Sequence, residues 1–343
     1  MTDFLVLVAN QGDDTIGSFE LTGGVLTPLT RSPITGCSTF AVDERRDLVF
    51  ASSKDGPSVV TMRLDRGTGV LTEVGRRAVE AASNYLALSG DGSLLLSASY
   101  HGGFGTSSPV SDAGEVGEPV SRIAHANMHS AAITADRRFA YFVSLGDDLV
   151  AQCAVGEGGE LAPLDPPTVA APPGSGPRHL VLDAGESTVY VLTEFTAEAL
   201  RLRRDPASGT LEFLDSVPTA DPAAGLGRSG YGRDPRADHL IWGADIHLAP
   251  DQSTLWCSER TASTLATLPV TPSGALEPPL AFVGTEPQPR GFAVSPDGRW
   301  LVAAGERSTT VSLYRLDDRV PRLVQQAPTG AGANWVRIVE RRR

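Results

Sequence analysis

RHLVLDAGESTVYVLTE, residues 178–194, consists of a short apolar strand, an acidic and glycine-containing turn, and a second apolar strand with a polar end. The same two-strand unit begins at positions 37, 84, 129, 244 and 290. In chain order, the six starting positions are separated by 47, 45, 49, 66 and 46 residues. A repeat of about forty to fifty residues built from strand pairs is typical of the four-stranded blades of a β-propeller.

The two ends of the chain predict one further blade. ANWVRIVE at 333–340 has the character of a first strand, and FLVLVANQGDDTIGSFEL at 4–21 has that of the strands that follow. Joining them leaves no open sheet edge between the first and last blades. We therefore expect an all-β fold, a seven-bladed β-propeller with its last blade closed by N- and C-terminal strands, as a single domain over 1–343. The one long interval holds an insert loop, DPAAGLGRSGYGRDPRADH, at 221–239.

The composition excludes several classes of partner. A net charge of −12 disfavours nucleic acid and anionic membranes, both of which need a basic face. The three cysteines, Cys37, Cys153 and Cys257, are widely spaced and fit neither a disulfide framework nor a zinc site. The N-terminus lacks the basic region of a signal peptide, and no apolar run is long enough to cross a bilayer. We expect a cytoplasmic protein, monomeric or weakly homo-oligomeric, with a small-molecule substrate.

Equivalent positions of propeller blades lie at equivalent places around the central channel. Polar and cationic residues dominate the first position of the repeat, and polar residues also dominate the end of its second strand. The first ring is Cys37, Asn84, His129, Arg178, Ala244, Arg290 and, in the closing blade, Asn334. The second ring is Asn10, Ser53, Ser99, Leu145, Glu194, Glu259 with Arg260, and Glu306. We expect these rings to face one small enclosed volume.

The residue types in these rings suit water attack on a small anionic ester or lactone. Histidine supplies a base near neutrality, and arginine holds an anionic group or a developing oxyanion. Each of these side chains could also simply bind water and cap a strand end. The predicted catalytic residues are His129, Glu194, Arg178, Arg260 and His247. The predicted substrate-binding residues are Arg290, His179, Asn84, Asn10 and Glu259.

Within this site we expect His129 to act as the base, Glu194 to orient water or hold a substrate hydroxyl, and His247 to act as the acid. The pH profile of kcat/KM should then have an acidic limb near the pKa of a histidine. The alternative is Glu194 as the base. We expect no cofactor and no metal, because the cations of the rings would repel an ion held by Asn84, Glu194 and Asp245. The remaining histidines are expected in solvated loops: His101, His125 and His239. The tryptophans are expected to pack between blades: Trp242, Trp256, Trp300 and Trp335.

Several segments resemble the seven-bladed lactonase family of the bacterial 6-phosphogluconolactonase type, which is related to the fungal carboxy-muconate cyclases. They are MHSAAITAD at 128–136, GSGPRH at 174–179, ADIHLAPD at 244–251, ERTAS at 259–263, QPRGFAVSPDGRWLVAAG at 288–305 and GANWVRIV at 332–339. The resemblance implies a propeller fold and lactone hydrolysis. It places the family's pocket residues at His129, Arg178, Glu194 and Arg260, with His247 and Arg290 beside them.

Departures from the family leave the substrate open. Ala132 stands where the family has an asparagine, and the insert at 221–239 has no family counterpart. The lactone therefore need not be the phosphorylated one. Two other functions remain. One is a cyclase that forms a lactone from a muconate-type diacid. The other is a binding scaffold without catalysis, because a propeller fold does not by itself imply an enzyme.

Overall fold

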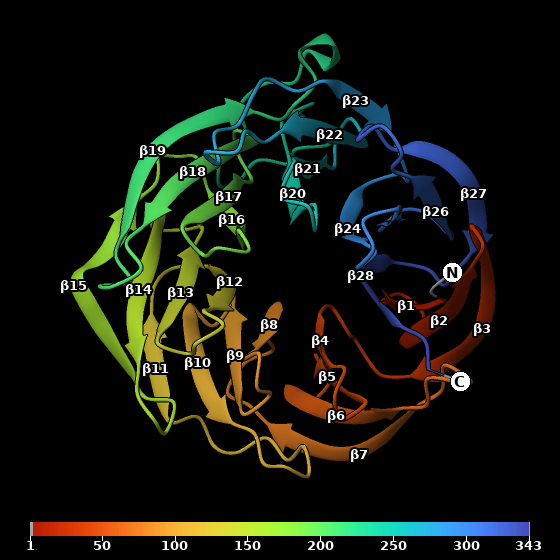
Figure 1. Ribbon diagram of the computed structural model, residues 1–343, viewed down its shortest axis with the longest axis horizontal. Coiled ribbons are helices and arrows are strands. Elements are labelled where there is room, and N and C mark those ends of the chain that lie inside the picture. Colours follow the sequence, from red (N-terminus) through yellow and green to blue (C-terminus); the bar gives the residue numbers. More distant parts are fainter. Residues whose placement is uncertain (1–2, 343) are drawn as a thin grey trace.

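A computed structural model describes residues 3–342, in which 28 strands form seven four-stranded antiparallel sheets around a central channel (Figure 1). The strands nearest the channel are β4 (Phe40–Asp43), β8 (Tyr85–Leu88), β12 (Met128–Ile133), β16 (Pro177–Leu182), β20 (Gly243–Leu248), β24 (Pro289–Val294) and β28 (Ala333–Glu340). The second strands are β5 (Leu48–Ser53), β9 (Leu94–Ser99), β13 (Phe139–Ser144), β17 (Thr188–Thr193), β21 (Thr254–Glu259), β25 (Trp300–Gly305) and β1 (Phe4–Asn10). The sequence-based prediction of seven blades is confirmed.

The third and fourth strands complete each blade toward the rim. The third strands are β6 (Ser58–Leu64), β10 (Phe104–Pro109), β14 (Leu149–Val155), β18 (Glu198–Arg204), β22 (Thr264–Pro269), β26 (Thr310–Arg315) and β2 (Thr15–Thr22). The outer strands are β7 (Leu71–Ala78), β11 (Ser121–Ala124), β15 (Leu161–Ala170), β19 (Leu211–Pro218), β23 (Ala281–Gly284), β27 (Arg322–Pro328) and β3 (Val25–Pro33). Among the described residues, no helix is long and apolar enough to span a membrane.

The hydrophobic core lies between neighbouring blades rather than at a single centre. Strands such as β13, FAYFVS, and β17, TVYVLT, are buried along their whole length because a sheet covers each of their faces. Their apolar side chains meet in one cluster per pair of adjacent sheets; Tyr141 and Val143, for example, pack with Val189 and Leu200. Removing apolar surface from water is the main stabilising contribution to such an interface.

The closing blade joins the two ends of the chain. β28 is its inner strand and pairs antiparallel with β1, with Val8 opposite Val336. The strands then continue outward through β2 and β3. Figure 1 shows the red N-terminal strands beside the blue C-terminal strand, as the sequence predicts.

The insert at 221–239 contains a short 3-10 helix, η1 (Pro222–Ala224), and otherwise forms loops. The ring of Tyr231 packs against Phe195, with centroids 5.0 Å apart, and its hydroxyl donates to Asn127 Oδ1 at 3.3 Å. Arg228 donates to the carbonyl of Pro173 at 2.7 Å. These contacts hold the insert against the loops around Glu194, next to the channel.

Candidate active site

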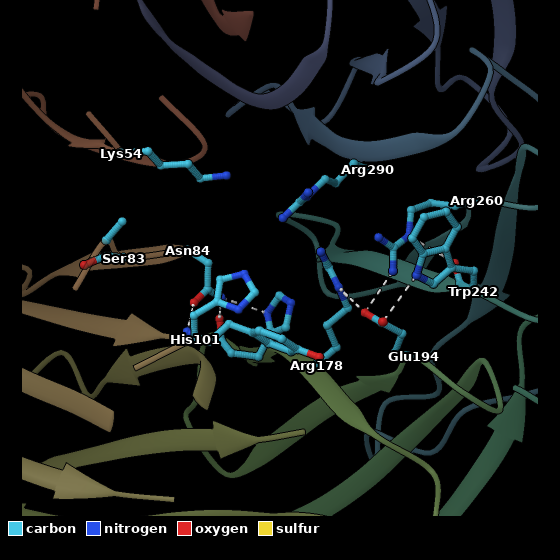
Figure 2. Close-up of a pocket in the computed structure, with 12 residues that line it drawn as sticks. Lys54, Ser83, Asn84, His101, Arg178, Glu194, Trp242, Arg260 and Arg290 are labelled. Carbon is cyan, nitrogen blue, oxygen red and sulfur yellow. Dashed lines mark hydrogen bonds and ion pairs between the residues drawn. The ribbon is translucent and has the colours of Figure 1, made fainter. Parts of the chain in front are cut away.

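A cavity of about 450 Å³ lies where the inner strands begin. Figure 2 shows the side chains that surround it, which come from several different blades. They belong to Lys54, Ala82, Ser83, Asn84, Tyr100, His101, His129, Arg178, Glu194, Trp242, Arg260 and Arg290.

β-Bulges in the inner strands supply three of these side chains. The pairing of β12 with β13 passes over His129, that of β16 with β17 passes over Arg178, and that of β24 with β25 passes over Arg290. A bulged residue interrupts the alternation of strand faces and re-aims its side chain. The three bulged residues occupy the first position of the sequence repeat, and all three line the cavity.

A second set of side chains comes from the residue directly after four of the seven second strands. Lys54, Tyr100, Glu194 and Arg260 follow β5, β9, β17 and β21, and all four line the cavity. Because side chains alternate along a strand, the last strand residue points elsewhere. Ser99, for example, donates to the carbonyl of Ala82 at 2.9 Å and so anchors the loop before the inner strand.

This alternation corrects the expected substrate contacts of Asn10 and Glu259, which are last strand residues. Asn10 Oδ1 accepts from Thr329 Oγ1, in the loop between β27 and β28, at 2.8 Å. Glu259 Oε1 accepts from the backbone N–H of Trp242 at 2.7 Å. Neither side chain lines the cavity. Both side chains anchor loops instead. In the blade of Glu259, the next residue, Arg260, faces the cavity.

Glu194 is held by three donors from three sides. Its Oε2 lies 3.0 Å from Arg178 Nε and 2.8 Å from Arg260 Nη2, and its Oε1 accepts from Trp242 Nε1 at 3.2 Å. The Arg260 guanidinium also lies over the Trp242 ring, 3.9 Å from its centroid. Trp242 is thus a wall of the cavity as well as a packing residue, which corrects its expected role.

Arg178 is positioned by a buried chain of polar side chains. Its Nη1 donates to the carbonyl of Ala244 and, at 3.0 Å, to His179 Nε2. His179 Nδ1 lies 2.8 Å from Asp245 Oδ1. Burial and then Arg178 lower the pKa of His179 to about 3, so the ring is neutral, donates through Nδ1 and accepts through Nε2. His179 therefore lies beneath the cavity and orients Arg178 instead of lining the cavity itself.

His247 lies outside the cavity. Its Nε2 is 3.2 Å from the other oxygen of Asp245, and its ring packs against Phe292 with centroids 4.6 Å apart. It therefore shares Asp245 with His179 but does not reach the space beside Glu194. The acid role expected of His247, which was based on residue type and motif alone, stays a prediction that its position outside the cavity does not favour.

Asn84 sets the tautomer of the neutral His129 ring. The Asn84 amide accepts from the N–H of Tyr100 at 2.6 Å and donates to the carbonyl of His129 at 2.6 Å, and these bonds fix its orientation. Asn84 Nδ2 also lies 3.3 Å from His129 Nδ1. Because an amide nitrogen is a donor, His129 Nδ1 acts as the acceptor. Burial and then Arg178 lower the pKa of His129 well below its usual value. The neutral ring carries its proton on Nε2 and offers a donor, which argues against His129 as the base.

The sequence analysis missed part of the cavity wall. Lys54 and Tyr100 follow strands whose last residues, Ser53 and Ser99, stood in the predicted ring, so the prediction was displaced by one position. His101, an exposed loop side chain as the sequence predicts, also lines the cavity from the next loop position. Counting from the strand end to the following residue in every blade would have found Lys54 and Tyr100.

Within residues 3–342, no group of three or more His, Cys, Asp or Glu side chains is placed to hold a metal ion. The three cysteines are free and buried. Burial raises the pKa of Cys37 to about 12 and that of Cys153 to about 11, so these thiols are poor nucleophiles near neutrality.

The fold and the cavity together define a β-propeller with a polar, cation-rich site at its channel. The sequence model of one family, described as "Lactonase, 7-bladed beta-propeller", matches residues 75–338, and the chain belongs to this family.

The chain is similar to curated members named 6-phosphogluconolactonase. It is 29% identical over 334 residues to that of Sodalis glossinidius, which covers 96% of this chain and 94% of the relative. It is 31% identical over 284 residues to that of Pectobacterium carotovorum, covering 82% and 81%. Among solved structures, the periplasmic gluconolactonase of Pseudomonas aeruginosa has a TM-score of 0.87 at 22% identity and covers 99% of this chain and 100% of that chain. This last likeness is one of fold.

Proposed function

We propose that the protein hydrolyses a small anionic lactone in the channel cavity. The observation that carries this proposal is the arrangement of two arginines around one carboxylate. Arg178 and Arg260 both bind Glu194, and each guanidinium retains N–H groups that can donate to a substrate. Among the described residues, none accepts from Arg178 Nη2 or Arg260 Nη1. Figure 2 shows both guanidiniums directed toward the same space.

In the proposed reaction, these spare N–H groups bind the lactone carbonyl and stabilise the oxyanion that forms when water attacks. Such preorganised donors stabilise charge that develops in the transition state. Burial and then Arg260 lower the pKa of Arg178 to about 9, which leaves the guanidinium charged at neutrality. The second lone pair of Glu194 Oε1 orients the attacking water and accepts its proton as the new carbon–oxygen bond forms.

His129 then acts as a donor to the ring oxygen of the lactone, through Nε2–H. As the carbon–oxygen bond breaks, this oxygen gains negative charge, and a hydrogen bond to it lowers the barrier. The proton that Glu194 took from the water ends on this oxygen, which completes the hydrolysis. The roles assigned here differ from the sequence-based ones, in which His129 is the base. The names of the curated relatives support the lactone class.

The test is ring opening of a panel of lactones by the purified protein: 6-phosphogluconolactone, glucono-lactone and muconolactone. Arg178→Lys should lower kcat/KM at least about 100-fold, because an ammonium cannot reproduce the guanidinium's bonds to Glu194, His179 and Ala244. The control is Arg322→Gln, which removes an exposed cation at the rim and should match the unmodified protein. If no lactone opens faster than in buffer, lactone hydrolysis is excluded.

A second candidate is the reverse chemistry, the closure of a muconate-type diacid to a lactone. The specific observation in its favour is that four cations, Lys54, Arg178, Arg260 and Arg290, line one cavity and could hold two carboxylates. Consumption of the diene, followed by its ultraviolet absorbance, would identify this reaction in the same panel. A scaffold without catalysis would accelerate neither direction.

A further inference from the structure

A second cavity, of about 400 Å³, opens where the inner strands end. Its wall includes Leu88 of β8, Ile133 of β12, Leu182 of β16 and Val339 of β28, each at or next to the last residue of its strand. The candidate active site lies where the same strands begin, so this lower cavity occupies the opposite mouth of the channel. Its volume falls in the range of about 300 to 1,000 Å³ that is typical of small-molecule sites.

A layer of aromatic rings separates the lower cavity from the candidate active site. His129 lines the candidate active site and Tyr85 lines the lower cavity. The ring of His179 lies between them, with its centroid 5.1 Å from that of each. Trp335 completes the layer, 5.3 Å from Tyr85 and 5.8 Å from His179, and both Trp335 and His179 are buried. A ligand in the lower cavity therefore does not reach the space beside Glu194.

The wall of the lower cavity is apolar. Among the described residues that line it, all but Glu44, Tyr85 and Arg337 are alanine, valine, leucine or isoleucine. Ala132, which stands where the lactonase family has an asparagine, belongs to this wall and keeps it apolar. Such a surface favours a ligand that buries hydrocarbon against it.

One cation of the lower cavity lacks a carboxylate partner. The guanidinium of the half-buried Arg337 lies over the Trp335 ring, 4.4 Å from its centroid, and its Nη1 donates to the carbonyl of Val336 at 2.8 Å. Within residues 3–342, no group accepts from its Nε or Nη2. Glu44, the carboxylate of the same wall, instead binds Arg66 Nη1 at 3.2 Å. The guanidinium thus keeps N–H donors for an anion.

The Tyr85 hydroxyl supplies a second donor near this cation. It has no hydrogen-bond partner among the described residues. Burial raises the pKa of Tyr85 and the charge of Arg337 opposes this rise, so the hydroxyl keeps its proton at neutrality and lies within reach of the Arg337 field. A guanidinium and a hydroxyl can together donate to the two oxygens of a carboxylate.

We propose that the lower cavity binds a small apolar carboxylate. Its carboxylate accepts from Arg337 and Tyr85, and its hydrocarbon part packs against the aliphatic wall. A sugar acid or a phosphate fits this cavity poorly, because the rest of the wall leaves their other polar groups without partners. The site is separate from the one proposed for lactone hydrolysis, and its occupation requires no catalysis.

Calorimetric titration of the full chain with octanoate tests the site. We expect a dissociation constant on the order of 0.1 to 1 mM for a ligand of this size. Arg337→Gln should weaken binding at least about tenfold and Tyr85→Phe about threefold, through lost hydrogen bonds to the carboxylate. Ala132→Asn, which places an amide in the apolar wall, should weaken binding at least about threefold.

The matched control is Arg290→Gln, which removes a cation from the candidate active site and should leave the affinity for octanoate within about twofold. A loss of binding in Arg290→Gln and not in Arg337→Gln would place octanoate in the candidate active site and overturn the proposal. In the unmodified protein, 1-octanol should bind at least about tenfold more weakly than octanoate. Equal binding of the two, or no octanoate binding up to about 10 mM, overturns the proposal without recourse to a variant.

A second copy of the chain is the other occupant to test. Sedimentation velocity with and without octanoate should give the same monomeric species. A dimer that octanoate dissociates would show that a neighbouring chain covers the lower cavity, which overturns the assignment to a small molecule. Because these measurements are made at equilibrium, octanoate binding in a protein that opens no lactone would overturn the proposed function and retain this site.

Discussion

At the scale of single residues, Asp245 determines the orientation of the Arg178 side chain through His179. It accepts from His179 Nδ1 at 2.8 Å and from the backbone N–H of Phe292 at 3.2 Å. Although burial raises its pKa, His247 and His179 lower it, so that the carboxyl remains ionised well below its usual range. The ionised carboxylate keeps the proton of His179 on Nδ1, which leaves Nε2 free to accept from Arg178.

Asp245→Asn should disturb this chain without touching the cavity wall. An amide beside Nδ1 favours the other tautomer of His179, whose Nε2–H would oppose the N–H of Arg178. We expect kcat/KM to fall about 10- to 100-fold, in line with the loss of an orienting partner, with the histidine tautomer read by nitrogen NMR. His247→Gln is the matched control, because it contacts the same carboxylate but not the cavity. A large loss of activity in His247→Gln would instead support the sequence-based assignment of His247 as the acid.

The two buried neutral histidines also predict how stability depends on pH. The pKa of His179 is about 3 and that of His129 is well below its usual value in the folded protein, whereas both side chains titrate near 6.5 when unfolded. The unfolded chain therefore binds more protons below about pH 6.5, and the free energy of unfolding decreases as the pH falls through that value. Above this pH the two histidines cause no further change.

Each histidine should contribute about 1.4 kcal/mol per pH unit between about pH 6 and 4.5. Guanidinium unfolding at pH 7.5, 6.0 and 5.0 measures this slope, and His179→Gln should reduce it by about half. His239→Gln, at an exposed position in the insert, serves as the control. An unaltered slope in His179→Gln would show that the ring is not held neutral.

At the scale of the elements, one glycine allows two blades to meet beside the site. A Cβ added at Gly243, the first residue of β20, would lie 2.3 Å from the carbonyl oxygen of Thr193. The N–H of Gly243 donates to the carbonyl of Glu194 at 2.9 Å, and its own carbonyl accepts from Arg260 at 3.0 Å. The close approach of β20 to β17 at Gly243 thus lets one residue bond to both Glu194 and Arg260, the two partners of an ion pair.

Gly243→Ala should push β20 away from β17. We expect a loss of about 1 to 3 kcal/mol in the free energy of unfolding, together with a fall in kcat/KM of about tenfold or more. Gly284→Ala in β23 is the control, because its added Cβ would have no neighbour within 4 Å. Wild-type activity in Gly243→Ala would show that the site tolerates a shift of this strand.

The strand ends also show how far sequence reasoning extends. The two-strand repeat predicts the blades, because each pair of strands must bury both faces and therefore repeats the same apolar pattern. It predicts His129, Arg178 and Arg290 at one shared position, where bulges turn them into the cavity. The repeat does not show whether the last residue of a second strand or the residue after it faces the cavity. This difference matters because adjacent side chains point to opposite sides. Lys54 was missed for this reason.

At the scale of the whole molecule, Trp335 connects the closing blade to its neighbours. It is 3% exposed, and its Nε1 donates to the carbonyl of Phe40 at 2.9 Å. Its ring contacts those of Tyr85 and His179 edge-on, with centroids 5.3 and 5.8 Å away. The side chain therefore bridges from β28 to the inner strands of other blades around the channel.

Trp335→Ala should weaken closure of the ring. Truncation of a buried tryptophan typically costs about 3 to 5 kcal/mol, and equilibrium unfolding in guanidinium measures the loss. Leu323→Ala, on the exposed outer strand β27, is the control and should change stability by less than about 0.5 kcal/mol. A loss of similar size in both variants would show that closure does not depend on this contact.

The pairing of β1 with β28 has a consequence for synthesis on the ribosome. Residues 4–10 emerge from the ribosome before their partner at 333–340, which is translated more than 300 residues later. At about 5 to 20 residues per second, the edge of β1 waits about 15 to 60 s for its partner strand. During that interval the nascent chain presents an apolar strand edge of the kind that aggregates or recruits chaperones.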